Sequence, residues 1–175
     1  WQFGKGIEPD DNGLIRLRIT SATNFAQLRG PSVCEVVADD EMATAIARIG
    51  PDPIHKKADP VRAWDRVHRS AAPIGALLMD QKIFAGVGNI YRAEVLFRHQ
   101  ISPFTHGRVI SNEQFDAIWS DLVFLMTLGV KNGRIDTVRA AHLPEAMGRE
   151  PRVDRHGGEV YVYRREGMKC FVCGP

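Results

Sequence analysis

The stretch from Met79 to Ser102 constrains this chain most, because it joins two helical segments through a pair of glycines. An apolar helix end is interrupted at Gly86 and Gly88, and an amphipathic helix begins at Asn89. Asparagine is a favoured N-cap residue, and the unpaired backbone N–H groups after it lie at the positive end of the helix dipole. A phosphate fits such a place, and glycines leave no side chain to keep it away.

Taken alone, a Gly-X-Gly turn before a helix is a weak signal, and an ordinary tight turn explains it equally well. It is not the dinucleotide-binding fingerprint, because Tyr91 stands where that motif has its third glycine. Two cations, Lys82 and Arg92, flank the turn. The local pattern therefore allows a phosphate site without requiring one.

The distribution of charge is more informative than the net charge of +2. Residues 55–110 carry 9 Lys and Arg against 4 Asp and Glu, and residues 131–175 carry 9 against 6. The intervening residues 111–130 carry 3 acids and no Lys or Arg. The two basic segments could form one positive face in the fold. Ordinary solvated surfaces are the alternative.

Bulk composition indicates a soluble protein of one domain or two small ones. Hydrophobic residues make up 44% of the 175 residues, which suffices for a core. We find no apolar run of membrane-spanning length and no export signal. Three cysteines do not make a disulfide framework, so we expect a reducing, cytoplasmic setting.

Periodicity predicts an α+β chain that begins with strands and continues with helices. The run LIRLRIT at 14–20 alternates, so Ile15, Leu17 and Ile19 should face a core. A further strand is expected at Val33 to Val37. Helices are expected at 39–48, 61–69, 74–82, 89–99 and from Ser111 to about Leu128, with a polar linker and domain boundary at 53–59.

The C-terminal part should contain a long, irregular connection from Lys131 to Gly158, a strand from Glu159 to Arg165, and a cysteine pair. Cys170 and Cys173 have the Cys-X2-Cys spacing of half a tetrahedral zinc site, which needs four ligands. A redox pair or two spare thiols are the alternatives.

The segment LLMDQKIFAGVGNIYRAEVLFRHQISP at 77–103 closely resembles the helix-two-turns-helix of the formamidopyrimidine-DNA glycosylase and endonuclease VIII family. The resemblance extends to RIGPDP at 48–53 and to VYVYRREGMKCFVCG at 160–174, so it covers most of the chain but only the later two-thirds of the family architecture. It implies a truncated α+β fold with three parts: a remnant of the N-terminal β-sandwich catalytic domain at 1–52, the helical DNA-binding domain at 53–150, and the start of a zinc-finger β-hairpin at 151–175.

The resemblance also implies site residues, a cofactor and a partner. The residues expected to contact DNA are Arg48, Lys82, Gly86, Gly88, Asn89 and Arg165. Cys170 and Cys173 should supply two of the four ligands of a structural zinc ion. The expected partner is damaged double-stranded DNA, bound by a monomer.

The activity that the resemblance implies is that of a base-excision-repair DNA glycosylase with abasic-site lyase activity. In the family an N-terminal proline attacks the damaged nucleoside, and a glutamate and a lysine move the protons. None of the three stands at a recognisable position here, so we expect a DNA-binding fragment that catalyses nothing. Glycine at Gly75, where the purine-directed branch has lysine, favours the endonuclease VIII branch and oxidised pyrimidines.

Two other classes of function remain open from the sequence. A non-catalytic nucleic-acid-binding protein is the first, because the helix-two-turns-helix also occurs in a ribosomal protein and in a class of topoisomerase. A helical interaction domain with a merely solvated basic face is the second. The GPDP segment at 50–53 and the Cys-X2-Cys tail favour the glycosylase.

Overall fold

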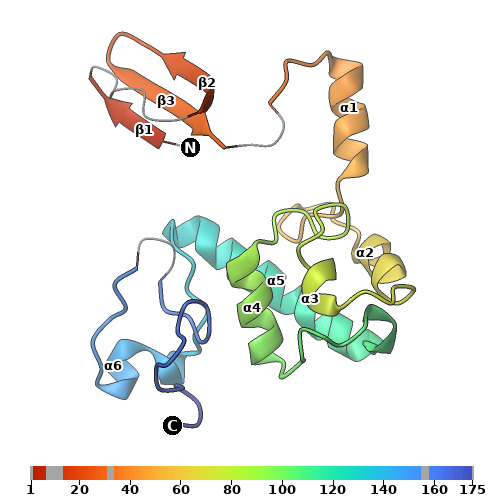
Figure 1. The fold of residues 1–175 in the computed structure, drawn as a ribbon, viewed down its shortest axis with the longest axis vertical. Helices are drawn as coiled ribbons and strands as arrows, with labels where there is room; N and C mark the ends of the chain where they lie inside the picture. Colours follow the sequence, from red (N-terminus) through yellow and green to blue (C-terminus); the bar gives the residue numbers. More distant parts are fainter. Residues whose placement is uncertain (1, 7–13, 31–33, 155–157, 175) are drawn as a thin grey trace. The chain divides into compact units, whose positions relative to one another are not determined.

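The structure is a computed structural model that describes residues 2–6, 14–30, 34–154 and 158–174. The chain forms two units, residues 1–44 and residues 45–175 (Figure 1). The division falls inside a helix, earlier than the linker at 53–59 that the sequence suggested. The C-terminal segment belongs to the second unit and does not separate from the helices.

The first unit contains a three-stranded antiparallel sheet in the order β1-β3-β2. Its strands are β1 (Gln2–Lys5), β2 (Ile15–Thr20) and β3 (Asn24–Arg29). The predicted strand at 14–20 is confirmed, but its side chains find little core, since Ile19 is 56% exposed and Leu17 is 39% exposed. In the described residues of this unit, Phe25 of β3 is the one buried hydrophobic side chain.

The strand expected at Val33 to Val37 is wrong in its described part. Val33 lies outside the described residues, and Cys34 to Val37 have no regular structure. The third strand is instead β3, whose sequence NFAQLR buries Phe25 and Gln27. A glutamine at an inward position breaks the apolar alternation by which a strand is recognised.

Helix α1 (Asp39–Arg48) forms where it was predicted. The Glu41 carboxylate accepts the backbone N–H of Ala38 at 2.9 Å, and three acidic residues lie in the first turn, where the helix dipole favours them. None of the ten residues of α1 is buried. Local capping therefore accounts for this helix, and packing does not.

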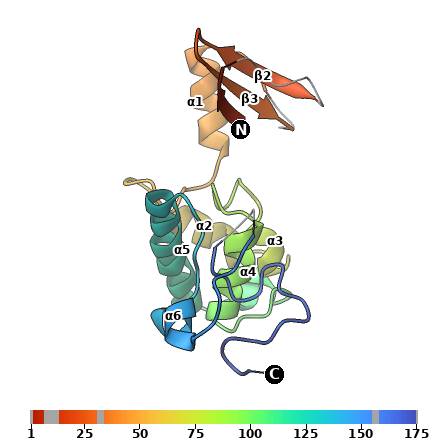
Figure 2. The same ribbon diagram turned by 90° about the vertical axis from the view of Figure 1, so that its left-hand side faces the viewer.

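The second unit is built on a helical core. Its elements are α2 (Pro60–Val67), α3 (Ile74–Leu77), α4 (Asn89–Arg98), the short η1 (Gly107–Val109), α5 (Asn112–Asn132), η2 (Ala140–His142) and α6 (Pro144–Met147). Figures 1 and 2 both show α4 beside the long α5. Buried side chains from α2, α3, α4 and α5, and Phe84 from the connection between α3 and α4, meet there. The helical ones include Val67, Ile74, Val95, Ile118 and Leu122.

Two of these helices begin with side-chain caps. Asp59 accepts the N–H of Val61 ahead of α2, and Ser111 forms a capping box with Gln114 ahead of α5. Helix α5 runs beyond Leu128, through Gly129, to Asn132, and Gly133 ends it in the left-handed conformation. Gly129 is needed within the helix, because a Cβ there would lie 2.3 Å from the Tyr91 hydroxyl.

The C-terminal segment differs from the expected hairpin. Residues 134–154 and 158–174 contain η2 and α6 but no strand, so the strand predicted from Glu159 to Arg165 is wrong. The backbone N–H groups of Tyr161, Val162 and Tyr163 donate to a carboxylate of α4 and are not available for a strand ladder. Over the described part of the chain, no helix combines the length and the apolar character that membrane crossing requires.

Candidate nucleic-acid interface

The connection between α3 and α4 makes two successive turns. Helix α3 ends at Leu77, earlier than the expected Lys82, and residues 81–86 form the turns. The side chain of Gln81 fixes them, because its Oε1 accepts the N–H of Gly86 at 2.8 Å and its Nε2 donates to the carbonyl of Val87 at 2.9 Å. Gly86 has a φ of +79°, where glycine is favoured.

The GPDP segment is packed against this corner. The N–H of Gly50 donates to the Gln81 carbonyl at 2.9 Å, and the N–H of Ala85 donates to the Pro51 carbonyl at 3.2 Å. A Cβ on Gly50 would lie 2.4 Å from the carbonyl carbon of Ile83, so this approach requires glycine. Arg48 is exposed at the end of α1 and stands two residues before Gly50 in the chain.

The first turn of α4 corrects one detail of the prediction. Gly88, and not Asn89, is the N-cap, and Asn89 is the first helical residue. The Asn89 side chain does not cap, because its Oδ1 accepts a hydrogen bond from the guanidinium of Arg92. No internal hydrogen bond within the described residues uses the backbone N–H groups of Asn89, Ile90 or Tyr91.

Much of the corner is exposed to solvent. Lys82, Gly86 and Asn89 are exposed, and Gly88 is half-buried. Gly88 has an extended backbone that any residue adopts, and a Cβ placed on it would meet no atom within 4 Å. The fold itself therefore gives no reason for glycine at position 88.

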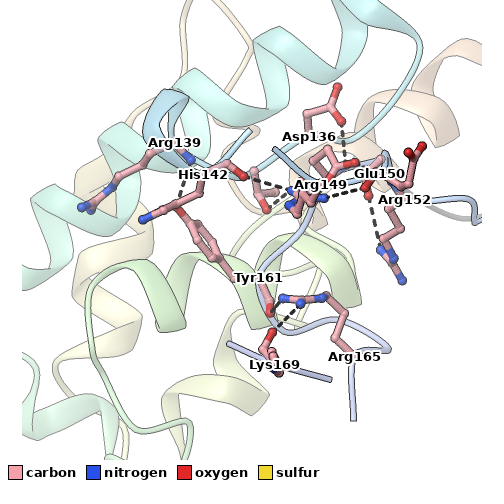
Figure 3. Close-up of polar contacts among 12 residues, drawn as sticks. Asp136, Arg139, His142, Arg149, Glu150, Arg152, Tyr161, Arg165 and Lys169 are labelled. Atoms are coloured by element: carbon pink, nitrogen blue, oxygen red, sulfur yellow. Dashed lines mark hydrogen bonds and ion pairs between the residues drawn. The ribbon is translucent and has the colours of Figure 1, made fainter. Parts of the chain in front are cut away.

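Arg165 does not reach this surface as an open cation. It is 9% exposed, and its guanidinium donates to the carbonyls of Tyr161 and Lys169, both at 2.7 Å (Figure 3). Burial lowers the pKa of Arg165, and the charges of Arg149 and Arg152 lower it further. A guanidinium held in this way supports the C-terminal segment, and the contact of Arg165 with DNA stays a prediction.

Cys170 and Cys173 lie in one turn that suits a metal-binding thiolate pair. The N–H of Val172 donates to the Cys170 sulfur at 3.4 Å, and Gly174, with a φ of +85°, donates its N–H to the Cys170 carbonyl. Hydrogen bonds to its sulfur, first from the backbone of Cys173 and then from Val172, lower the pKa of Cys170. The pKa of the Cys173 thiol is raised, chiefly because this thiol is hydrogen-bonded to Cys170.

The donor set fits half of a structural zinc site. Two thiolates at this spacing match two of the four ligands of tetrahedral zinc. Nowhere in the described ranges do three or more His, Cys, Asp or Glu residues come together as a metal site. Bound zinc would cross-link the turn, and Cys170 and Cys173 are the residues that would hold it from this chain.

Sequence reasoning missed two residues that organise the interface. Gln81 links the two turns, but a polar residue between helices gives no signal of its own. Glu94 of α4 was overlooked within an amphipathic helix, although it is completely buried. A charged residue on the apolar side of α4 was the available signal, since buried carboxylates need partners.

A helix, two turns braced by the GPDP segment and a second helix with an open N-terminus together form a helix-two-turns-helix motif. The family profile described as the formamidopyrimidine-DNA glycosylase H2TH domain matches residues 49–140, more than half of the chain. The chain belongs to this family of DNA-repair proteins.

Individual relatives agree with the assignment. Endonuclease 8 1 of Mycobacterium tuberculosis (strain ATCC 25618 / H37Rv) is 48% identical over 172 residues, which cover 97% of this chain and 62% of that protein. A formamidopyrimidine-DNA glycosylase of Parasynechococcus marenigrum (strain WH8102) is 33% identical over 129 residues, covering 74% of this chain and 44% of the relative. The homologues are DNA glycosylases, and the chain spans less than two-thirds of their length.

Solved structures show the same fold. MutM (Fpg) from Thermus thermophilus matches with a TM-score of 0.67 at 26% identity, covering 99% of this chain and 65% of that one. Lactococcus lactis Fpg, in a complex with DNA containing an abasic site, matches with a TM-score of 0.70 at 19% identity, covering 98% of this chain and 62% of that chain.

Proposed function

We propose that this chain is the DNA-gripping part of a base-excision-repair glycosylase of the endonuclease VIII type. The observation that carries the proposal is the N-terminus of α4, where three successive backbone N–H groups have no acceptor within the described residues. Such groups, at the positive end of a helix dipole, suit a phosphate. The family match makes the sugar-phosphate backbone of damaged DNA the expected source of that phosphate.

Each residue at the corner has a specific part in the proposal. The N–H groups of the first turn of α4 donate to the phosphate, and the Asn89 side chain adds a donor, because its oxygen is already engaged by Arg92. Lys82 and Arg48 contribute positive charge. Gly88 lets the phosphate approach the backbone, which supplies the reason for glycine that the fold lacks.

In this proposal the glycosylase is bifunctional: it also has abasic-site lyase activity, and it prefers oxidised pyrimidines. The similarity to endonuclease 8 1 supports this branch. Gly75 supports it less than the sequence suggested, because a Cβ there would lie 3.0 Å from the Pro103 side chain, so close packing also favours glycine. Catalytic groups would come from outside these residues, and the chain alone would bind DNA without cleaving it.

The test compares wild-type chain and Asn89→Ala for binding to a duplex with one abasic site. Loss of the side-chain donor should weaken binding by about 1 to 3 kcal/mol, and wild-type affinity should fall steeply as salt rises. An equal affinity of the two proteins would remove Asn89 from the site. A salt-independent affinity would point to a protein partner. Borohydride trapping on the same duplex should give no covalent adduct.

A further inference from the structure

The side chain of Glu94 is a fully buried carboxylate in the middle of α4. Its Oε2 accepts the N–H of Tyr161 at 2.6 Å and the hydroxyl of Thr137 at 2.7 Å. Its Oε1 accepts the N–H groups of Val162 and Tyr163, both at 2.8 Å. Four donors therefore converge on one carboxylate, which offsets the cost of burying the charge.

These contacts join parts of the chain that are far apart in sequence. The three backbone donors lie 67, 68 and 69 residues after Glu94. Glutamine could not replace this carboxylate, because it has one acceptor oxygen and would turn an NH2 group toward backbone donors. The charge of Glu94 is thus specifically matched to the C-terminal segment.

From this attachment, the contacts continue to the cysteine turn. Arg165 donates to the Tyr161 carbonyl at 2.7 Å, and its guanidinium lies 3.5 Å from the ring centre of Phe171, between the two cysteines in sequence. The guanidinium of Arg149 lies 3.9 Å from the same ring centre. Two cations this close to one ring cannot share a face, so the ring of Phe171 is held between them.

Arg149 is in turn fixed to the segment that carries Tyr161. It donates to the Glu159 carboxylate at 2.6 Å and to the His142 carbonyl at 3.0 Å. Figure 3 shows Arg149, Tyr161 and Arg165 in this cluster of contacts. An unbroken series of contacts therefore runs from the DNA-facing helix α4, through Glu94, to the turn that holds Cys170 and Cys173.

We propose that Glu94 is a positioning residue that makes the end of α4 and the cysteine segment act on DNA as one body. This inference rests on the proposed DNA-binding function. Glu94 touches no phosphate itself. It holds the segment that bears the exposed cations Arg164 and Lys169, so that they add phosphate contacts to those of the α4 N-terminus.

The test uses the chain of residues 1–175 in four forms: wild type, Glu94→Gln, Thr137→Val and the control Glu166→Gln. Glu166 is an exposed acid of the same segment, so its substitution makes the same charge change without affecting the attachment. Thr137→Val removes one of the four donors to Glu94 and is the milder variant, in case Glu94→Gln does not fold. Circular dichroism establishes that helix content is retained.

Two quantities are measured on each protein. The first is amide hydrogen exchange at Tyr161 to Tyr163, which should accelerate at least roughly tenfold in Glu94→Gln, less in Thr137→Val, and not in the control. The second is the salt dependence of binding to an abasic-site duplex. Glu94→Gln should bind roughly 5- to 10-fold more weakly, and its log–log slope should be smaller by about one phosphate contact or more.

The outcomes separate this inference from the proposed function. Faster exchange together with a smaller salt slope supports the positioning role. Unchanged exchange overturns the attachment, and faster exchange with an unchanged slope overturns the coupling to DNA and leaves a structural role only. If the wild-type chain itself shows no salt-dependent binding, the proposed function fails, and the positioning role on DNA fails with it.

Discussion

The two units of this chain differ in what holds their secondary structure in place. In the first unit, a three-stranded sheet buries Phe25 as its one buried hydrophobic side chain among the described residues, and Ile19 and Leu17 face solvent. In the second unit, four helices share a continuous apolar core that includes Phe84, Phe115 and Leu122. The strands of the first unit bury little apolar surface, whereas the core of the second unit also holds its connecting loops in place.

The comparison shows where a precise site can be built. The two-turn corner lies on the second unit, where Ile83, Phe84 and Val87 anchor the turns in the core and leave the glycines outside. A rigid support of this kind fixes backbone donors before a ligand arrives, which lowers the entropy cost of binding. The sheet of the first unit offers no equivalent support within the described residues.

The largest expected effect comes from the core itself. Phe84→Ala should destabilise the second unit by about 3 to 5 kcal/mol, because it removes a fully buried ring and leaves a cavity. Ile19→Ala in β2 is the matched truncation in the first unit, and should cost less than about 1 kcal/mol because the side chain is largely exposed. Urea denaturation measures both. Similar losses of unfolding free energy in Phe84→Ala and Ile19→Ala would contradict the difference in packing between the two units.

A smaller effect is expected from the ion pair that fastens α4 to α5. Arg98 donates to Asp121 through Nε at 2.6 Å and Nη2 at 2.8 Å, and both side chains are 11% exposed. Asp121→Asn should cost about 3 kcal/mol, because it leaves a poorly solvated guanidinium without its counter-charge. The exposed pair Arg69 and Asp65, at 3.9 Å, is the control, and Asp65→Asn should change the unfolding free energy by less than about 1 kcal/mol.

The smallest effect concerns the polar C-terminal part of the second unit, and it depends on pH. Burial raises the pKa of Glu159, but hydrogen bonds from the Arg149 side chain and the Arg152 backbone outweigh burial, and the net shift is downward. A lowered pKa in the folded state stabilises the protein above the pKa of a free glutamate, and this stabilisation is lost as pH falls through the folded value. Glu159→Gln should therefore lose stability at neutral pH and show a weaker acid dependence than wild type. Hydrogen exchange at residues 158–165, measured as a function of pH, follows this stability. The same acid dependence in wild type and Glu159→Gln would contradict the stabilising role of the Glu159 carboxylate.

The sequence predicts most of what depends on neighbouring residues. The helix at 39–48, the start of a helix at Ser111 and the restart of a helix after Gly88 were all predicted, because each depends on residues within one turn. The N-cap was misplaced by one residue, since the favoured capper Asn89 uses its oxygen for Arg92 instead. The N-cap preference of asparagine does not show that a nearby arginine competes with the helix-end N–H groups for the side-chain oxygen.

Features that depend on distant residues were not predictable in the same way. A strand was expected at 159–165, yet the backbone N–H groups of Tyr161 to Tyr163 are taken by Glu94. Arg165 matched a motif expected to contact DNA, but the carbonyls of Tyr161 and Lys169 already hold it. The strand was lost to a partner 67 to 69 residues away, whereas Arg165 is held by carbonyls only four residues from it on either side, through turns that the sequence pattern does not show.

The central claim is that the end of α4 is left open for a phosphate, and Gly88→Asn tests it most directly. Asparagine at this N-cap would supply an internal acceptor to the helix-end N–H groups and would occupy the space that glycine leaves. We predict that the free energy of unfolding stays the same or rises by a few tenths of a kcal/mol, while affinity for an abasic-site duplex falls by about tenfold or more. Gly133→Asn, at the left-handed C-cap of α5, is the matched control and should leave DNA affinity unchanged, at a cost in stability of about 1 kcal/mol or less because asparagine tolerates the left-handed conformation less well than glycine. A Gly88→Asn protein that binds DNA as tightly as wild type would contradict the account.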